Sequence, residues 1–226
     1  MNLEPYTKHF SVVMVGGFNP NNYQLHRLSK LDLVSQKDCD DAKVIANGKN
    51  LQITFPWTEL VVTHDRLMLS TSSDEYLHVF KDLLISLVSI FETTAVTGVG
   101  INGRYTYALN NEKDWHKLGH YLVPKESWKT ALDDTKCNIG TNNVRVQVDD
   151  YINEPTKGIL NIELRPILND EKDYVKNSIL IGYNCHFNTD ETKIGLVINI
   201  IESNLDFLFK NYLTISNNII DGAINK

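Results

Sequence analysis

His116 and His120 have the spacing that most directly suggests chemistry. They lie four positions apart in a segment with helical character, so they share one face of a helix. Two imidazoles on one face can bind a transition metal, but a metal site needs a third ligand. No glutamate stands between them, unlike in zinc-protease helices. Histidines that cap the helix or pack against neighbouring aromatic rings are the favoured interpretation, and a metal site is the alternative.

Glu163, Arg165 and Arg104 form the second candidate group. Glu163 and Arg165 are two apart in a segment that alternates as a strand does, so their side chains share a face. Arg104 shares a face with Asn102 in another predicted strand. Such charges bind a charged ligand or lie together in solvent. If a polar site lies between the two halves of the chain, we expect Arg104, Glu163 and Arg165 to bind its ligand.

Two further motifs do not support the chemistry that they suggest. Gly98, Gly100 and Gly103 match the dinucleotide pattern GxGxxG, but this motif precedes a strand rather than a helix. The glycines are better explained by close approach of another backbone or side chain. Cys185 and His186 are neighbours in a strand, so they point to opposite faces and cannot form a nucleophile–base pair. We expect a structural cysteine and no cofactor.

The elements that position these residues are organised around Ser73–Leu109, which predicts a long amphipathic helix followed directly by a strand. Apolar residues recur at steps of three and four in the helix, and Ser73 and Asp74 supply its N-cap chemistry. The apolar stripe comprises Leu77, Phe80, Leu84, Leu87 and Phe91. The strand alternates between apolar and polar positions.

Short apolar runs predict strands and hairpins before this helix. Residues 10–15 form one predicted strand, and residues 42–46 and 51–55 flank Asn47-Gly48, a dipeptide typical of a type I′ turn. A second hairpin joins residues 60–63 to 67–70, and a short helix is expected around residues 25–34.

The second half repeats this layout. Helices are expected at residues 112–123 and 124–132, strands near 144–148, 159–168, 179–187 and 193–201, and a closing amphipathic helix at 204–223. The predicted fold class is α+β, with two antiparallel-sheet halves that each finish in a long amphipathic helix. The halves span residues 1–133 and 144–226. The pattern leaves open whether they share one sheet and one domain.

Composition excludes several classes of protein. The chain has 226 residues, and its formal charge of −6 argues against a general electrostatic grip on nucleic acid. Three widely spaced cysteines favour a reducing compartment over a disulfide framework. Without a signal peptide or an apolar run long enough for a transmembrane helix, we expect a cytoplasmic protein with no membrane partner.

The middle third of the chain also carries a resemblance. Gly100–Asn102, Trp115–His120 and Trp128 with Pro124-Lys125 before it resemble a pattern in a sporadically distributed family of uncharacterised bacterial proteins. The resemblance implies a bacterial or phage source and a shared fold, and it carries no activity.

The first functional hypothesis is a non-enzymatic interaction protein. Two amphipathic helices would pair across a homodimer and dock a protein partner, as an accessory of a bacterial defence or mobile-element system. One alternative is a metal-dependent hydrolase or nuclease with a dispersed site from His116, His120, Glu163 or Arg165. The other is a small-ligand sensor with its ligand held near Arg104.

Overall fold

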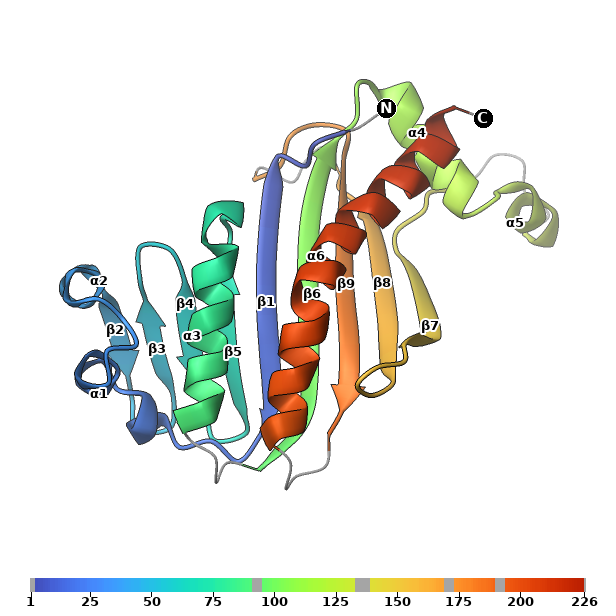
Figure 1. Ribbon diagram of the computed structural model, residues 1–226. Coiled ribbons are helices and arrows are strands. Elements are labelled where there is room, and N and C mark those ends of the chain that lie inside the picture. Colours follow the sequence, from blue (N-terminus) through green and yellow to red (C-terminus); the bar gives the residue numbers. More distant parts are fainter. Residues whose placement is uncertain (1–2, 91–94, 133–138, 169–172, 190–193, 226) are drawn as a thin grey trace.

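Nine antiparallel strands form one continuous sheet in the computed structural model, which describes residues 3–90, 95–132, 139–168, 173–189 and 194–225 (Figure 1). The strand order is β2-β3-β4-β5-β1-β6-β9-β8-β7. The first half contains β1 (Thr7–Gly16), a 3-10 turn (Pro20–Tyr23), α1 (Leu25–Lys30), α2 (Gln36–Asp41), β2 (Lys43–Ala46), β3 (Leu51–Thr54), β4 (Glu59–Val62), β5 (Arg66–Thr71), a 3-10 turn (Asp74–Tyr76) and α3 (Leu77–Ile90). The second contains β6 (Val96–Ala108), α4 (Glu112–Leu122), α5 (Glu126–Ala131), β7 (Val144–Ile152), β8 (Gly158–Pro166), β9 (Ser178–Asn188) and α6 (Ile194–Ile224).

The two halves repeat one topology. Each begins with a strand, continues through two short helices and an antiparallel meander, and closes with a long helix. The leading strands β1 and β6 pair antiparallel at the centre of the sheet, and each meander extends outward from its own leading strand. This repetition groups β6 with the second half, so the topological boundary falls between α3 and β6.

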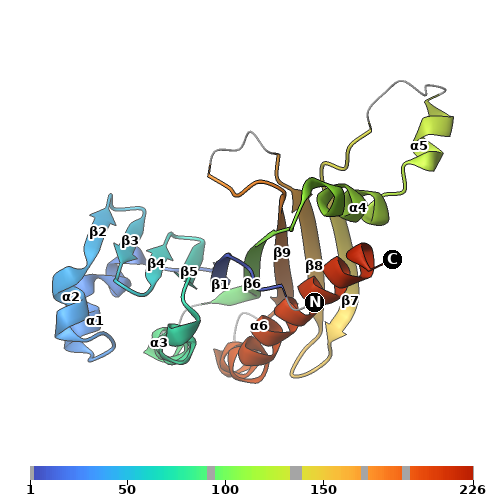
Figure 2. The ribbon, with the colours of Figure 1, turned by 90° about the horizontal axis from the view of Figure 1, so that it is seen from above.

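Helices α3 and α6 cover one face of the sheet, α3 over the first meander and α6 over the second half (Figures 1 and 2). Tyr212 of α6 stacks on Tyr183 of β9 with ring centroids 4.5 Å apart, and its hydroxyl donates to the carbonyl of Ile101 at 2.9 Å. Phe209 packs on Phe10 of β1 with centroids 4.7 Å apart. Since α6 contacts both central strands, its burial fastens the two halves together.

The fold class is confirmed, and so is the organising helix-strand unit, which appears as α3 and β6. The apolar stripe of α3 is buried at Phe80, Leu84 and Leu87. The α6 stripe is buried too, against the sheet. These stripes hold each helix to its own sheet, so they are not the free surfaces that pairing of helices across a dimer needs.

Two local predictions are wrong. The run expected as a strand at residues 193–201 is the beginning of α6 from Ile194 onward; Lys193 lies outside the described residues. Its branched apolar residues favour a strand, but Val197, Ile200 and Ile201 fall at helical spacing and pack into the core. The β2–β3 hairpin closes through the four residues 47–50 rather than a two-residue type I′ turn. Only Gly48 in this turn has a positive φ, at 79°. The side-chain oxygen of Asn47 accepts hydrogen bonds from the backbone amides of Lys49 and Asn50.

The glycines of the GxGxxG motif permit close approach, as the sequence predicts. A Cβ on Gly100 would lie 2.9 Å from the side-chain amide nitrogen of Asn184, and one on Gly98 would lie 3.0 Å from the ring of His186. Gly103 faces the other way, and its Cβ would lie 2.7 Å from the ring of Tyr212. Side chains of neighbouring elements occupy the space that these glycines leave.

No helix in the described residues is both long and apolar enough to cross a lipid bilayer.

Candidate functional site: a polar groove on the open face of the sheet

The face of the sheet opposite α3 and α6 carries polar side chains in register. Strand alternation turns every second side chain toward the face with the helices and the others toward the open face. One row of paired positions crosses all nine strands, and each of its residues is polar. The row runs Lys43, Thr54, Glu59, Ser70, Ser11, Asn102, Asn184, Asn161 and Gln147. Its second half is a row of carboxamides, which can donate and accept hydrogen bonds.

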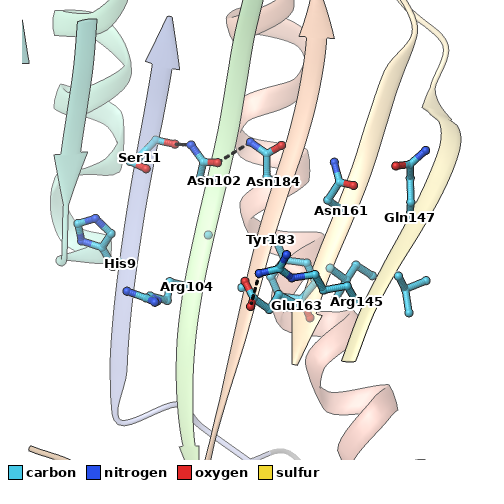
Figure 3. Close-up of a pocket in the computed structure, with 14 residues that line it drawn as sticks. His9, Ser11, Asn102, Arg104, Arg145, Gln147, Asn161, Glu163, Tyr183 and Asn184 are labelled. Atoms are coloured by element: carbon cyan, nitrogen blue, oxygen red, sulfur yellow. Dashed lines mark hydrogen bonds and ion pairs between the residues drawn. The ribbon is translucent and has the colours of Figure 1, made fainter. Parts of the chain in front are cut away.

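The carboxamide row is ordered by hydrogen bonds at its centre. The Asn184 amide donates to the Asn102 side-chain oxygen at 2.6 Å, and the Asn102 amide donates to the Ser11 carbonyl at 3.3 Å (Figure 3). These contacts fix the orientation of the central amides. Asn161 and Gln147 continue the row toward the edge of the sheet.

A charged row lies next to the carboxamide row on the same face, two residues away along each strand. It runs from Arg145 through Glu163, Gly182 and Arg104 to His9, each opposite the next in the strand register. Gly182 leaves the middle of the row open, because the nearest atom to a Cβ built there would be the Glu163 carbonyl oxygen at 4.0 Å. Side chains from four strands therefore flank an open position above Gly182.

These two rows line a groove of about 630 Å³. The groove lies on the face of the sheet away from α6, and the labelled side chains of Figure 3 come from five adjacent strands. The lining residues are His9, Ser11, Asn102, Gly103, Arg104, Arg145, Val146, Gln147, Asn161, Ile162, Glu163, Gly182, Tyr183 and Asn184. Its size is within the range of small-molecule sites.

Glu163 is held as a carboxylate. The Asn143 side-chain amide donates to it at 2.6 Å and the Arg145 guanidinium donates at 3.2 Å. These hydrogen bonds, the Asn143 contact first, lower the pKa of Glu163 below its ordinary value. The carboxylate in turn fixes Arg145 at the β7 side of the groove.

Arg104 supplies the second positive charge of the groove. It is exposed and takes part in no ion pair in the part of the chain that the structure describes. Burial and the nearby Arg104 charge lower the pKa of His9, because both disfavour the imidazolium form. With His9 neutral, two arginines against one glutamate give the groove a net positive charge in a chain whose formal charge is −6.

No family model and no curated protein matches this chain.

Two of the three ligand-binding residues that the sequence predicts line this groove. Arg104 and Glu163 stand on either side of Gly182, whereas Arg165 lies further along β8 and is not among the lining residues. Sequence reasoning did not select Asn161 and Asn184. Their polar positions in alternating strands were the available signal, but the register that aligns them with Asn102 joins distant parts of the chain.

His116 and His120 lie elsewhere, exposed on α4. Each is within 3.5 Å of one glutamate, Glu112 for His116 and Glu126 for His120. Together with Lys113, Lys117 and Lys125 they line a different cavity from Glu163, so the dispersed catalytic site is not assembled there. Among the described residues no three His, Cys, Asp or Glu side chains gather to hold a metal.

Cys185 points from β9 into the core, and burial raises the pKa of its thiol to about 12. A thiol with this pKa is protonated at neutral pH and is a poor nucleophile. His186 faces the other side of the strand, above Gly98. The two side chains point to opposite faces, as the alternation of the strand predicts.

Proposed function

We propose that the protein binds a small polar ligand with an anionic group in the groove of the open sheet face. The observation that carries the proposal is Arg104, a guanidinium without an ion pair in the described structure, beside the open floor at Gly182. Guanidinium groups bind carboxylates and phosphates through paired hydrogen bonds. The carboxamide row beside it would bind the ligand's hydroxyl or amide groups.

The ligand's anionic group would lie over Gly182, between Arg104 and Arg145. Glu163 then has two roles, because it holds Arg145 in place and accepts hydrogen bonds from ligand donors. Asn102 and Asn184 already hydrogen-bond to each other, so they present fixed polar atoms to a ligand. A site whose groups are held before binding spends little conformational entropy on the ligand.

The proposal is binding without catalysis. A general acid or base works best with a pKa near the operating pH, whereas the Glu163 carboxylate has a lowered pKa. A sensor in the cytoplasm that passes the binding event to a protein partner combines this groove with the interaction role that the sequence predicts. The −6 charge of the whole chain favours a small anion over a polyanion such as nucleic acid.

Thermal unfolding with a panel of anions tests the proposal. The probes are inorganic sulfate, inorganic phosphate, citrate and a nucleoside monophosphate, each titrated against the wild-type chain. A ligand at about 100 times its Kd stabilises the folded state by about 2.7 kcal/mol, which raises the melting temperature by several degrees. We expect at least one probe to stabilise the wild type.

Matched variants locate the binding site. Arg104→Ala removes the free guanidinium from the groove, whereas Arg66→Ala removes the same charge from the open face outside it. Arg66 matches Arg104 in residue type and in the face of the sheet, but it lies outside the groove and 4.0 Å from Asp65. The proposal is supported if the anion no longer raises the melting temperature of Arg104→Ala but still raises that of Arg66→Ala. An equal rise in the two variants contradicts it.

A further inference from the structure

Strand β7 is an outer edge of the sheet and has no strand beyond it in the described structure. It has nine residues, against four in β2 at the other edge. Val146 and Val148 are exposed by 46% and 37%, so apolar surface accompanies the free backbone groups. A long edge of this kind pairs with another strand unless it is shortened or shielded. Strand β2 is protected by its four-residue length, whereas β7, in the part of the chain that the structure describes, presents a stretch from Val144 to Val148 that is unpaired on its outer side, before its register with β8 shifts.

Two oppositely charged residues of β7 lie at equal distances from Gln147. Arg145 lies two residues before Gln147, and Asp149 lies two residues after it. All three side chains are on the open face: Gln147 lines the groove, its amide donates to Asp149 at 2.8 Å, and Arg145 is paired with Glu163 on the same face. In an antiparallel pair of two identical strands centred on Gln147, Arg145 stands opposite Asp149 on both sides of the two-fold axis.

Neighbouring registers lack this match. A pair centred on Val146 sets Arg145 opposite Gln147 and Asp149 opposite Asn143. A pair centred on Val148 sets Gln147 opposite Asp149 and leaves Arg145 without an acidic residue opposite it. The register centred on Gln147 also sets Val146 opposite Val148 on the other face. Directly opposed charges of unlike sign stabilise an antiparallel pair, and like charges destabilise it.

We propose that β7 pairs antiparallel with β7 of a second copy of this chain, in the register centred on Gln147. The regular pairing of β7 with β8 extends from Val144 to Val148, and the register then shifts. This regular stretch carries most of the contact, and Asp149 follows it directly. The occupant of the edge is a second copy because the charge pattern is complementary to itself.

This pairing also joins the two binding grooves. Each carboxamide row ends at Gln147, so the two rows meet at the two-fold axis and continue into each other. Arg145 of each copy then lies between its own Glu163 and the second copy's Asp149. The dimer does not depend on the identity of a ligand, and its test uses none, so it can fail independently of the binding proposal.

Charge exchange tests the register. Arg145→Asp places two acidic residues opposite each other twice in the dimer, and Asp149→Arg does the same with two basic residues. We expect each single variant to raise the dimer Kd at least about tenfold in analytical ultracentrifugation. The double variant Arg145→Asp/Asp149→Arg restores unlike pairs, and so does an equimolar mixture of the two single variants. Both should dimerise as the wild type does.

The outcomes separate the proposal from its rivals. Arg145 and Asp149 are exposed, and circular dichroism with thermal unfolding checks that each variant folds. A wild-type chain that stays monomeric up to about 200 µM overturns the proposal. Dimers that survive in both single variants locate the interface elsewhere and also overturn it. Failure of the double variant and of the mixture to recover excludes the register centred on Gln147.

Discussion

His9 makes ligand binding in the groove depend on pH. Burial and the Arg104 guanidinium hold its pKa below the ordinary histidine value, so the ring is neutral at pH 7. Acidification protonates it and adds a positive charge beside Arg104, and a bound anion raises its pKa. Binding of an anion is therefore linked to proton uptake.

We expect the affinity for inorganic sulfate, whose charge stays constant, to increase several-fold as the pH falls from neutral through the lowered pKa of His9. Isothermal titration calorimetry at intermediate pH values measures it. His9→Gln keeps a polar side chain and should make the affinity independent of pH. An equal pH dependence in the wild type and in His9→Gln would assign the effect to another group.

Gly103 and Gly182 lie in adjacent strands, but we expect an added methyl group to destabilise the fold at Gly103 and to change its stability little at Gly182. Gly103→Ala sets a Cβ 2.7 Å from the Tyr212 ring and 2.9 Å from the Tyr105 ring, and overpacking of this kind costs about 1–3 kcal/mol. Gly182→Ala meets nothing closer than 4.0 Å and should change the free energy of unfolding by less than about 1 kcal/mol. Urea denaturation measures both, and similar losses in the two variants would contradict the packing described.

Arg104 and Glu163 could be selected from the sequence because a charged residue in a predicted strand identifies the face that it shares with its neighbours. The sequence could not predict that the two side chains lie on either side of Gly182, because strand register depends on pairing between distant parts of the chain. Asn102 and Asn184 hydrogen-bond across 82 residues of chain. Alternation places each amide on a face of its own strand, and nothing local aligns one strand with the next.

Helix α6 shows how far local patterns predict an element. Its existence and its apolar stripe follow from the spacing of Leu205, Leu208 and Tyr212. The branched residues among 193–201 predict a strand for its first turns. Tertiary burial against the sheet decides in favour of the helix there.

Tyr212 fastens α6 to the central strand, and its hydroxyl can be tested separately from its ring. Tyr212→Phe keeps the stack on Tyr183 but leaves the buried Ile101 carbonyl without this donor. We expect a loss of about 1–2 kcal/mol in the free energy of unfolding from urea denaturation. Phe207→Ala on the same helix removes an exposed ring and should cost less than about 0.5 kcal/mol. A cost for Phe207→Ala as large as that for Tyr212→Phe would argue against the orientation of α6.

The two halves of the molecule share one sheet and one hydrophobic core. The sequence predicts an α+β fold with two similar halves, but the pairing of β1 with β6 that unites them joins residues such as Ser11 and Asn102, 91 positions apart. Because this pair and α6 both span the junction, neither half keeps its core when the other unfolds.

Unfolding should therefore be a single transition. Trp57 reports on the first half, and Trp115, whose indole donates to the Ser178 carbonyl at 3.0 Å, reports on the second. Variants that keep one of the two tryptophans, with Trp128 replaced by Phe in both, should give the same urea midpoint by fluorescence. Separate midpoints would mean that the halves are independent domains.

Native mass spectrometry of the chain, purified gently from the cells that make it, tests the binding groove most directly. We expect a bound anionic molecule below about 1 kDa, as suits a groove of this size, in the wild type and in Arg66→Ala, and no bound molecule in Arg104→Ala. A bound molecule that Arg104→Ala retains, or a wild type free of any ligand that also fails to bind every anion of the panel, would contradict it.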